Sequence, residues 1–406
     1  MQLRKSSSIK APLRIAACAL LGVSTSVAAG GDPWEFDATV LYYSETDRVT
    51  ATEPLINVRK NFGDDRILNL RFVIDSLSGA TPNGASAADQ VQTFTTPSGA
   101  GSYTVSPGET PLDPTFQDTR TALTAQWEQP FGRLTKGSFS ANVSTEYDFK
   151  SLGASAAIAR DFNNRNTTFS AGLAAEFDVI EPVGGVPVPL ASMAPPGAVQ
   201  PRLGVDDDKT VIDVLLGVSQ IISRQALMQL NYSYSDSSGY HMDPYKLVSV
   251  LDPILGNPVD YVYENRPDSR SKQSLFWKMK YHLARDVIDV SYRFLWDDWG
   301  INSHTLDLHY RWQLRQKWYL EPHVRFYTQS AADFYVPNLF SASPLPAFAS
   351  ADYRLADFDA WTVGLSYGQT LSNKHQYNLR LEYYQQRGDD FFPELDAIIA
   401  QFGYKF

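Results

Sequence analysis

The chain has 406 residues, with 35 lysines and arginines against 45 aspartates and glutamates, and its net charge is −10 at neutral pH. This acidic balance argues against a nucleic-acid partner, because proteins that neutralise phosphates need a basic surface. The single cysteine, Cys18, lies near the start, so the rest of the chain has no disulfide and no cysteine-ligated metal site.

The first 29 residues have the layout of a cleaved secretory signal. A basic stretch containing Arg4 and Arg14 precedes the short apolar segment "IAACALLGVSTSVAA", which ends in small residues at Ala29. "IAAC" also resembles a lipoprotein cleavage box, but Arg14 stands directly before it. We predict cleavage after Ala29, which leaves a single mature domain of residues 30–406.

Segments of alternating apolar and polar residues follow. In "TLDLHYRWQL", residues 305–314, Leu306, Leu308 and Trp312 share one face and charged side chains occupy the other. Such segments run about ten residues, which is the length of a tilted strand crossing a bilayer and longer than most strands of soluble sandwiches. About sixteen are found, starting near Trp34, Leu55, Ile67, Arg120, Ser138, Leu152, Thr167, Thr210, Ala226, Gln273, Val287, Asn302, Trp318, Phe358, Gln376 and Asp396. We predict an all-β transmembrane antiparallel up-and-down barrel.

The connections between these segments alternate in length. Short polar turns at 63–65, 132–136, 163–165, 223–225, 284–286, 315–317 and 372–374 alternate with long links at 78–116, 180–207, 237–269 and 331–353. Outer-membrane barrels combine short periplasmic turns with long extracellular loops. We therefore expect a Gram-negative outer-membrane protein with both termini in the periplasm.

The final segment, "AQFGYKF", alternates aromatic residues with small or polar ones. We expect Phe402, Tyr404 and Phe406 to face lipid on a closing strand that pairs with the first strand, around Trp34. A terminal phenylalanine after alternating aromatic residues also resembles the assembly signal of outer-membrane barrels. This resemblance implies the barrel-assembly machinery and periplasmic chaperones as partners, besides outer-membrane lipid.

The polar faces predict a highly charged lumen. Candidate lumen-facing residues are Arg71, Glu146, Glu176, Asp213, Lys280, Arg293, Asp307, His309, Arg311, Glu321, His323, Arg325 and Arg380. These charges are interpreted either as pairs across neighbouring strands in a hydrated lumen, or as a field that selects a solute.

The hairpin around Gln316 gives the most specific expectation. A turn centred there places His309 opposite His323, with the rungs Arg311–Glu321 and Asp307–Arg325 beside them, so that opposite charges face each other. Two imidazoles alone do not complete a zinc or copper site, and both carboxylates look occupied by arginines, so no metal is expected. Pro322 lacks an N–H and predicts a missing rung or a bulge.

Two other motifs give weak indications of chemistry. Asp206–Asp208 lacks the spaced ligands of a calcium loop and is interpreted as a solvated loop. Ser303 and His304 are neighbours in a strand and point to opposite faces, so they do not form a nucleophile–base pair. No catalytic residue and no cofactor are expected.

The link at 237–269 contains the most distinctive motifs, "GYHMDPYK" and "RPDSR". They resemble an uncharacterised family of predicted outer-membrane barrels, known as a domain of unknown function (3570), which carries similar patterns. The matching candidate residues are Tyr240, Asp243, Tyr245, Lys246, Arg266, Asp268 and Arg270. We expect Arg266 and Arg270 to pair with Asp243. The loop is then either latched onto the rim or folded inward, or it forms a surface for a ligand or partner.

The sequence thus favours a porin-like channel for a small hydrophilic solute, without catalysis. A closed barrel that serves as an anchor or conduit for a periplasmic or surface partner is the alternative. The family resemblance implies that this partner belongs to a redox system, because family genes lie near a periplasmic flavin transferase. A barrel enzyme is the third possibility.

Overall fold

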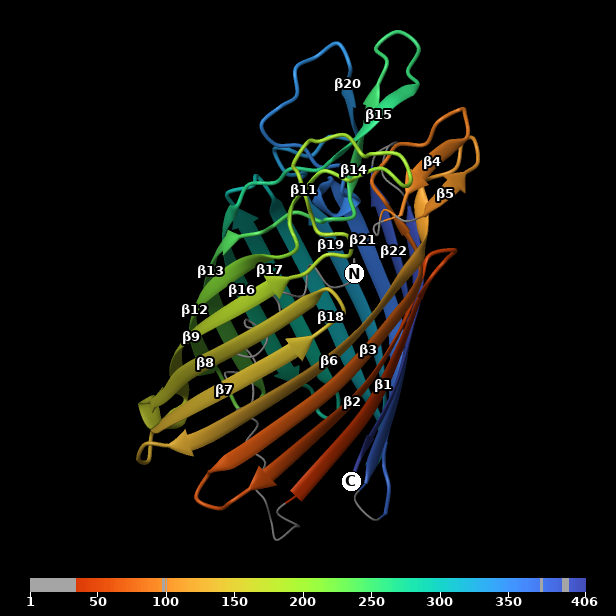
Figure 1. Cartoon of the computed structure of the whole chain (residues 1–406). Helices are drawn as coiled ribbons and strands as arrows, with labels where there is room; N and C mark the ends of the chain where they lie inside the picture. Colours follow the sequence, from red (N-terminus) through yellow and green to blue (C-terminus); the bar gives the residue numbers. More distant parts are fainter. Residues whose placement is uncertain (1–33, 97–98, 100, 373–374, 389–393) are drawn as a thin grey trace.

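The computed structural model describes residues 34–96, 99, 101–372, 375–388 and 394–406, and in these residues sixteen antiparallel strands form a closed barrel (Figure 1). The predicted signal segment lies outside the described residues. The barrel strands are β1 Trp34–Glu45, β2 Val49–Asn61, β3 Ile67–Pro82, β6 Leu112–Pro130, β7 Thr135–Thr145, β8 Phe149–Phe162, β9 Thr167–Ile180, β12 Asp207–Ile221, β13 Ala226–Gly239, β16 Ser269–His282, β17 Val287–Asp297, β18 Asn302–Arg315, β19 Trp318–Gln329, β21 Phe358–Thr370, β22 Gln376–Gly388 and β23 Leu395–Lys405. The sixteen predicted segments each fall in one of these strands, so the fold prediction is confirmed.

The barrel closes where β23 pairs with β1. Their register runs from Asp37–Lys405 to Glu45–Ala397. Beyond it, the backbones of Phe36 and Phe406 exchange two hydrogen bonds of 2.9 Å, and their rings stack with centroids 5.4 Å apart. Closure gives every strand two neighbours and leaves no sheet edge exposed.

The two faces of the wall differ as the alternation predicts. On β18, Leu306, Leu308 and Trp312 point outward with 42–51% of their surface exposed, whereas Ser303 and Asp307 lie on the inner face. On β23, Phe402 is 47% exposed on the outside while Ala397 and Gly403 are buried on the inside. A continuous exposed apolar wall of this kind is stable against lipid rather than water. Within the described residues, no helix has the length and hydropathy needed to cross a membrane.

One boundary differs from the prediction. β7 ends at Thr145, and Glu146 begins a turn that leads into β8 at Phe149. Glu146 is therefore a turn residue at one end of the barrel and not a lumen-facing strand residue. The apolar–polar alternation of the sequence continues through "TEYDF", yet the inner face changes from even positions on β7 to odd positions on β8, as the pair Ser144–Ser151 shows.

The connections at the two ends differ strongly in size. At one end, here called the short-turn end, the strands are joined by turns such as Gln316–Lys317, and β1 begins and β23 ends there. At the other end, four long segments fold over the barrel (Figure 1): residues 83–111, 181–206, 240–268 and 330–357. We call their described residues the loop cap.

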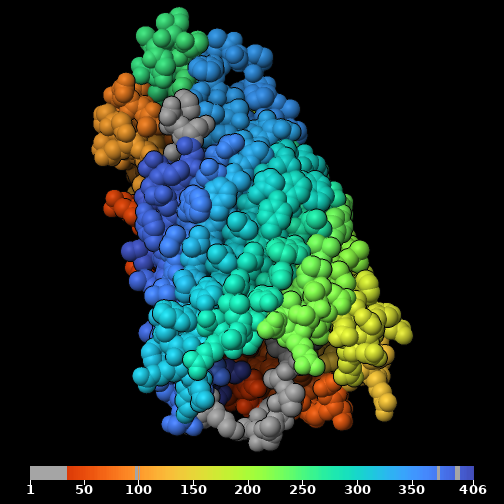
Figure 2. Space-filling view, turned by 180° about the vertical axis from the view of Figure 1, so that it is seen from behind, coloured from red at the N-terminus to blue at the C-terminus, as the bar shows by residue number. Residues whose placement is uncertain are grey.

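The loop cap has its own secondary structure. A three-stranded sheet joins β15 (Pro258–Tyr263), β14 (Leu247–Leu251) and β20 (Asn338–Phe340), and β14 and β20 are parallel. Two small ribbons pair β4 (Gln92–Thr95) with β5 (Ser102–Val105), and β10 (Val186–Pro187) with β11 (Arg202–Gly204). Figure 2 shows the green, blue and orange segments gathered together at this end. The long links predicted as loops are thus packed structure.

Candidate functional site

Two clusters of charged residues stand out, one in the loop cap and one on the inner wall. The first is an ion-pair hub made of Asp243, Lys246, Glu264, Arg266, Asp352 and Arg354. Arg266 Nε lies 2.8 Å from Glu264 Oε1, and its Nη2 lies 2.7 Å from Asp352 Oδ2. These three side chains are at most 6% exposed, so the hub is a buried network and not a solvated surface.

Arg354 extends the hub to the "DPYK" motif. Its Nη2 lies 2.9 Å from Asp243 Oδ2, and the same guanidinium binds Asp352. Asp243 in turn donates its backbone N–H to Glu264, and Lys246 donates to the carbonyl of Pro82 at the end of β3. The hub therefore ties the segments 240–268 and 330–357 to each other and to the barrel.

Tyr245 connects the same motif to two further segments of the chain. Its hydroxyl donates to Asp148 Oδ2 at 2.7 Å, in the turn between β7 and β8, and accepts from the N–H of Val183 at 2.9 Å. Three neighbouring motif residues, Asp243, Tyr245 and Lys246, thus bind three different parts of the chain. The motif therefore links its loop to the barrel and to two other segments, as expected for a latched loop.

Burial and neighbouring charge set the ionisation of the hub. Burial lowers the pKa of Lys246 to about 8 and raises the pKa of Glu264, which Arg266 partly offsets. Burial opposes ionisation of Asp352 as well, yet Arg354 and Arg266 hold its pKa well below its usual value. Asp352 is therefore the anionic centre on which both guanidinium groups converge.

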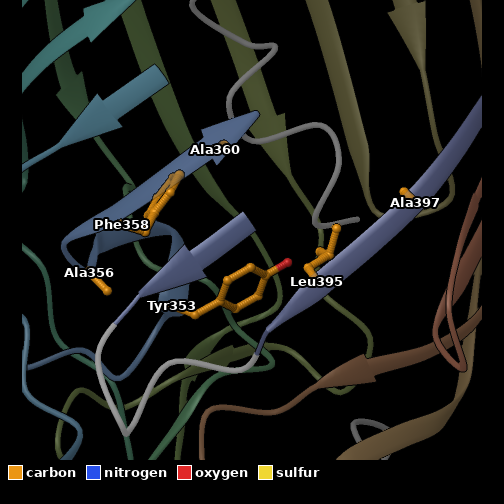
Figure 3. Close-up of a cluster of buried hydrophobic side chains, with 6 residues drawn as sticks. All are labelled: Tyr353, Ala356, Phe358, Ala360, Leu395 and Ala397. Carbon is orange, nitrogen blue, oxygen red and sulfur yellow. The ribbon is translucent and has the colours of Figure 1, made fainter. Parts of the chain in front are cut away.

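Apolar side chains insert from the loop cap into the barrel mouth. Tyr353, in the short helix η2 (Tyr353–Leu355), packs against Phe358 of β21 and Leu395 of β23, which point inward (Figure 3). Tyr240 packs with Ile180 at the end of β9. These contacts fix part of the loop cap in the mouth of the barrel, while β14, β15 and β20 extend beyond it (Figure 1).

The pairings predicted inside the loop motifs are wrong. Arg266 binds Glu264 and Asp352, Arg270 Nε donates to Asp297 at 2.8 Å, and the partner of Asp243 is Arg354. Asp268 is exposed, and its carbonyl accepts the N–H of Gly239 at 2.8 Å. Glu264 is two residues from Arg266, but Asp352 and Arg354 come from a segment 86 and 111 residues from their partners, so spacing within one loop could not reveal them.

The second cluster, here called the histidine cluster, lies on the inner wall and contains Asp307, His309, Glu321, His323 and Glu382. His309 and His323 are directly opposed across β18 and β19, as predicted, and their rings stack at 4.0 Å and 4°. Both Nε2 atoms face Asp307: His309 at 2.9 Å from Oδ1 and His323 at 3.3 Å from Oδ2.

A carboxylate also meets the other nitrogen of each ring. His309 Nδ1 lies 3.5 Å from Glu321 Oε1, and His323 Nδ1 lies 2.8 Å from Glu382 Oε1. Glu382 belongs to β22 and reaches His323 of β19 across the intervening strand β21. Gly364 of β21 pairs with His323 on one side and with Glu382 on the other. A Cβ at Gly364 would lie 2.3 Å from Cγ of Glu382, so this position must lack a side chain for the contact to form.

The predicted rungs beside the histidines are confirmed in part. Arg311 Nε binds Glu321 Oε2 at 2.6 Å, and Asp307 pairs with Arg325 in the register. The side-chain partner of Asp307 was assigned wrongly, because its carboxylate binds the two imidazoles and not Arg325. Between the pairs His309–His323 and Trp312–Leu320 the register of β18 and β19 has no pair at Pro322, and the register shifts before Arg315–Trp318. Pairing is therefore interrupted beside Pro322, as expected.

The remaining candidates lie around the inner wall. Arg71, Glu176, Asp213, Lys280, Arg293 and Arg380 occupy inner-face positions of β3, β9, β12, β16, β17 and β22. Lys278 and Lys280 flank Asp289 at 3.0 and 3.4 Å, and Lys209 binds Asp178 at 2.9 Å. Small hydroxyl pairs join other neighbouring strands, Ser140–Ser155 between β7 and β8 and Ser233–Ser274 between β13 and β16. The inner wall is polar from strand to strand.

An apolar belt outside, a polar wall inside and a closed antiparallel sheet define a transmembrane β-barrel of the outer-membrane type. The sequence from residue 10 to residue 406 matches the family described as "Protein of unknown function (DUF3570)", and the chain belongs to that family. The resemblance carried by the two loop motifs is thereby confirmed. No curated protein matches the sequence.

Solved structures show similarity of fold. CdiB from Acinetobacter baumannii aligns with a TM-score of 0.50 and 8% identity over 93% of this chain and 61% of its own. A bacterial polysaccharide outer membrane secretin aligns with a TM-score of 0.48 and 8% identity, over 93% of this chain and 99% of its own. A TodX monoaromatic hydrocarbon channel deltaS2 mutant aligns with a TM-score of 0.46 and 8% identity, over 95% of this chain and 93% of its own. At this identity the likeness to CdiB concerns the fold alone.

Proposed function

We propose that this protein is an outer-membrane channel for a small hydrophilic solute, with the loop cap controlling one mouth. The observation that carries the proposal is the polar inner wall of a sixteen-stranded barrel. A barrel of this strand number is too wide for its own inward side chains to fill completely, so an aqueous lumen remains unless loops occupy it. The long-loop end then faces the outside and the short-turn end faces the periplasm.

The charge of the wall supports selection and not only hydration. Inner-face lysines and arginines gather on β16 to β22, including Lys272, Arg293 and Arg325, whereas Glu176, Asp178 and Asp213 lie together on β9 and β12. Acidic residues such as Asp289, Glu321 and Glu382 pair with part of these cations, so the two sides differ in their excess charge and not in a single sign. An excess of cations on one side of a pore and of anions on another orients a polar solute as it passes.

The buried ion-pair hub favours a second candidate, a closed barrel that anchors or serves a periplasmic or surface partner. A packed loop cap can seal the mouth as well as narrow it. Single-channel recording in a planar bilayer separates these functions. Conductance steps from the wild-type barrel, or from a barrel whose β14–β15 hairpin has been replaced by a short glycine–serine linker, support the channel. Silence from both folded proteins supports the closed barrel.

A further inference from the structure

We propose that Asp307, His309 and His323 form a binding site for a first-row divalent cation, of the zinc or copper type, on the inner wall of the barrel. One oxygen or nitrogen atom from each of these residues lies within 4.8 Å of those from the other two. Imidazole nitrogen and carboxylate oxygen are ligands that these cations accept together.

The separations between the Asp307 oxygens and the two Nε2 atoms are close to those of neighbouring ligands on a tetrahedral ion. Bonds of about 2.0–2.1 Å place neighbouring tetrahedral ligands roughly 3.3 Å apart. The two Nε2 atoms lie 2.9 and 3.3 Å from the oxygens of Asp307. Parallel rings direct their lone pairs along parallel lines, so binding requires one ring to tilt. His309 is the ring with room to do so, since its side chain is 33% exposed to the lumen.

The surrounding carboxylates are placed to orient both ligands. A metal-bound histidine usually donates its other N–H to a carboxylate, which fixes the tautomer and the ring orientation. Glu382 meets Nδ1 of His323 at 2.8 Å, and Glu321 lies 3.5 Å from Nδ1 of His309. Both imidazoles therefore hold Nε2 on the side of Asp307, one against each of its carboxylate oxygens. A structural polar ladder needs only one hydrogen bond from each ring, whereas here both nitrogens of both rings face a carboxylate.

Access to the site comes from the lumen. Asp307 is 23% exposed and His309 33%, whereas His323 is 9% exposed behind them. An ion that enters the pore meets the open side of the site without any strand having to move. The remaining coordination positions then belong to water or to a solute carried in the pore.

The test uses the full-length barrel purified in detergent, stripped with chelator and titrated with Zn²⁺ alone or Cu²⁺ alone. Calorimetry is expected to give one Zn²⁺ per barrel, and the electron paramagnetic resonance spectrum of the Cu²⁺ form is expected to show coupling to two nitrogens. The double variant His309→Gln with His323→Gln should weaken binding at least 100-fold. His304→Gln is the matched control, because His304 lies on the outer face of the same strand.

Gly364→Ala tests the orienting role of Glu382 without altering a ligand. The new Cβ displaces Glu382 from His323, and loss of such a partner typically weakens metal binding about 10–100-fold. Heat-modifiable migration on a gel verifies that each barrel is folded. The proposal is overturned if the wild type does not bind Zn²⁺ at micromolar concentration, if the double variant binds as the wild type does, or if the bound Cu²⁺ couples to fewer than two nitrogens.

Discussion

Removing Arg266 should open the loop cap while the barrel stays intact. Arg266→Ala deletes the only guanidinium that bridges Glu264 and Asp352 in the described part of the hub, and both carboxylates are 1% exposed. Breaking a buried pair from one side typically costs 3–5 kcal/mol. Here Glu264 stays buried without its guanidinium, while Asp352 keeps Arg354. The cost falls on the loop cap, since the hub lies outside the barrel sheet. It corresponds to a roughly 100- to 4,000-fold increase in the open population.

Hydrogen exchange measures this opening directly. The backbone amides of Asn265 and Ala349, which bond each other's carbonyls at 2.8 and 2.9 Å, should exchange faster by about that factor in Arg266→Ala. Lys150→Ala is the control: its pair with Glu181 is 2.7 Å long but 57% and 41% exposed, and exposed pairs contribute about 0–1 kcal/mol. If both variants leave these amides equally protected in a folded barrel, the hub does not hold the loop cap.

Three further outcomes follow from the fold. Leu308→Arg should impair insertion into bilayers far more than Thr305→Arg. An arginine that faces lipid near the midplane costs about 2–4 kcal/mol, whereas one that faces the lumen stays hydrated. Equal folding yields would mean that the two faces are assigned wrongly. Deleting Phe406 should leave unassembled protein in the periplasm, since its backbone and ring complete the contact with Phe36, and normal heat-modifiable barrel would contradict this. Replacing the β14–β15 hairpin should raise single-channel conductance; an unchanged value in a folded barrel would make that hairpin an external structure only.

The sequence by itself determined the barrel wall. Side chains alternate with a period of two along any strand, so "TLDLHYRWQL" assigned Leu308 to lipid and His309 to the lumen before any neighbour was known. Short turns then join adjacent strands, and for this reason the opposition of His309 and His323 followed from counting residues across one turn. The same reasoning failed at Glu146, because the apolar–polar alternation of the sequence runs on through the turn although the strand ends at Thr145.

Only the tertiary structure decided which residues share a site. Glu382 meets His323 because β21 places a glycine between them, and nothing in the spacing of residues 323 and 382 indicates this. Asp352 and Arg354 join the loop motifs through contacts between separate loops, for which the sequence has no repeating pattern. The alternation of side chains along a strand follows from backbone geometry, so each segment shows it by itself. The packing of long loops depends instead on which distant side chains the closed barrel brings to one mouth.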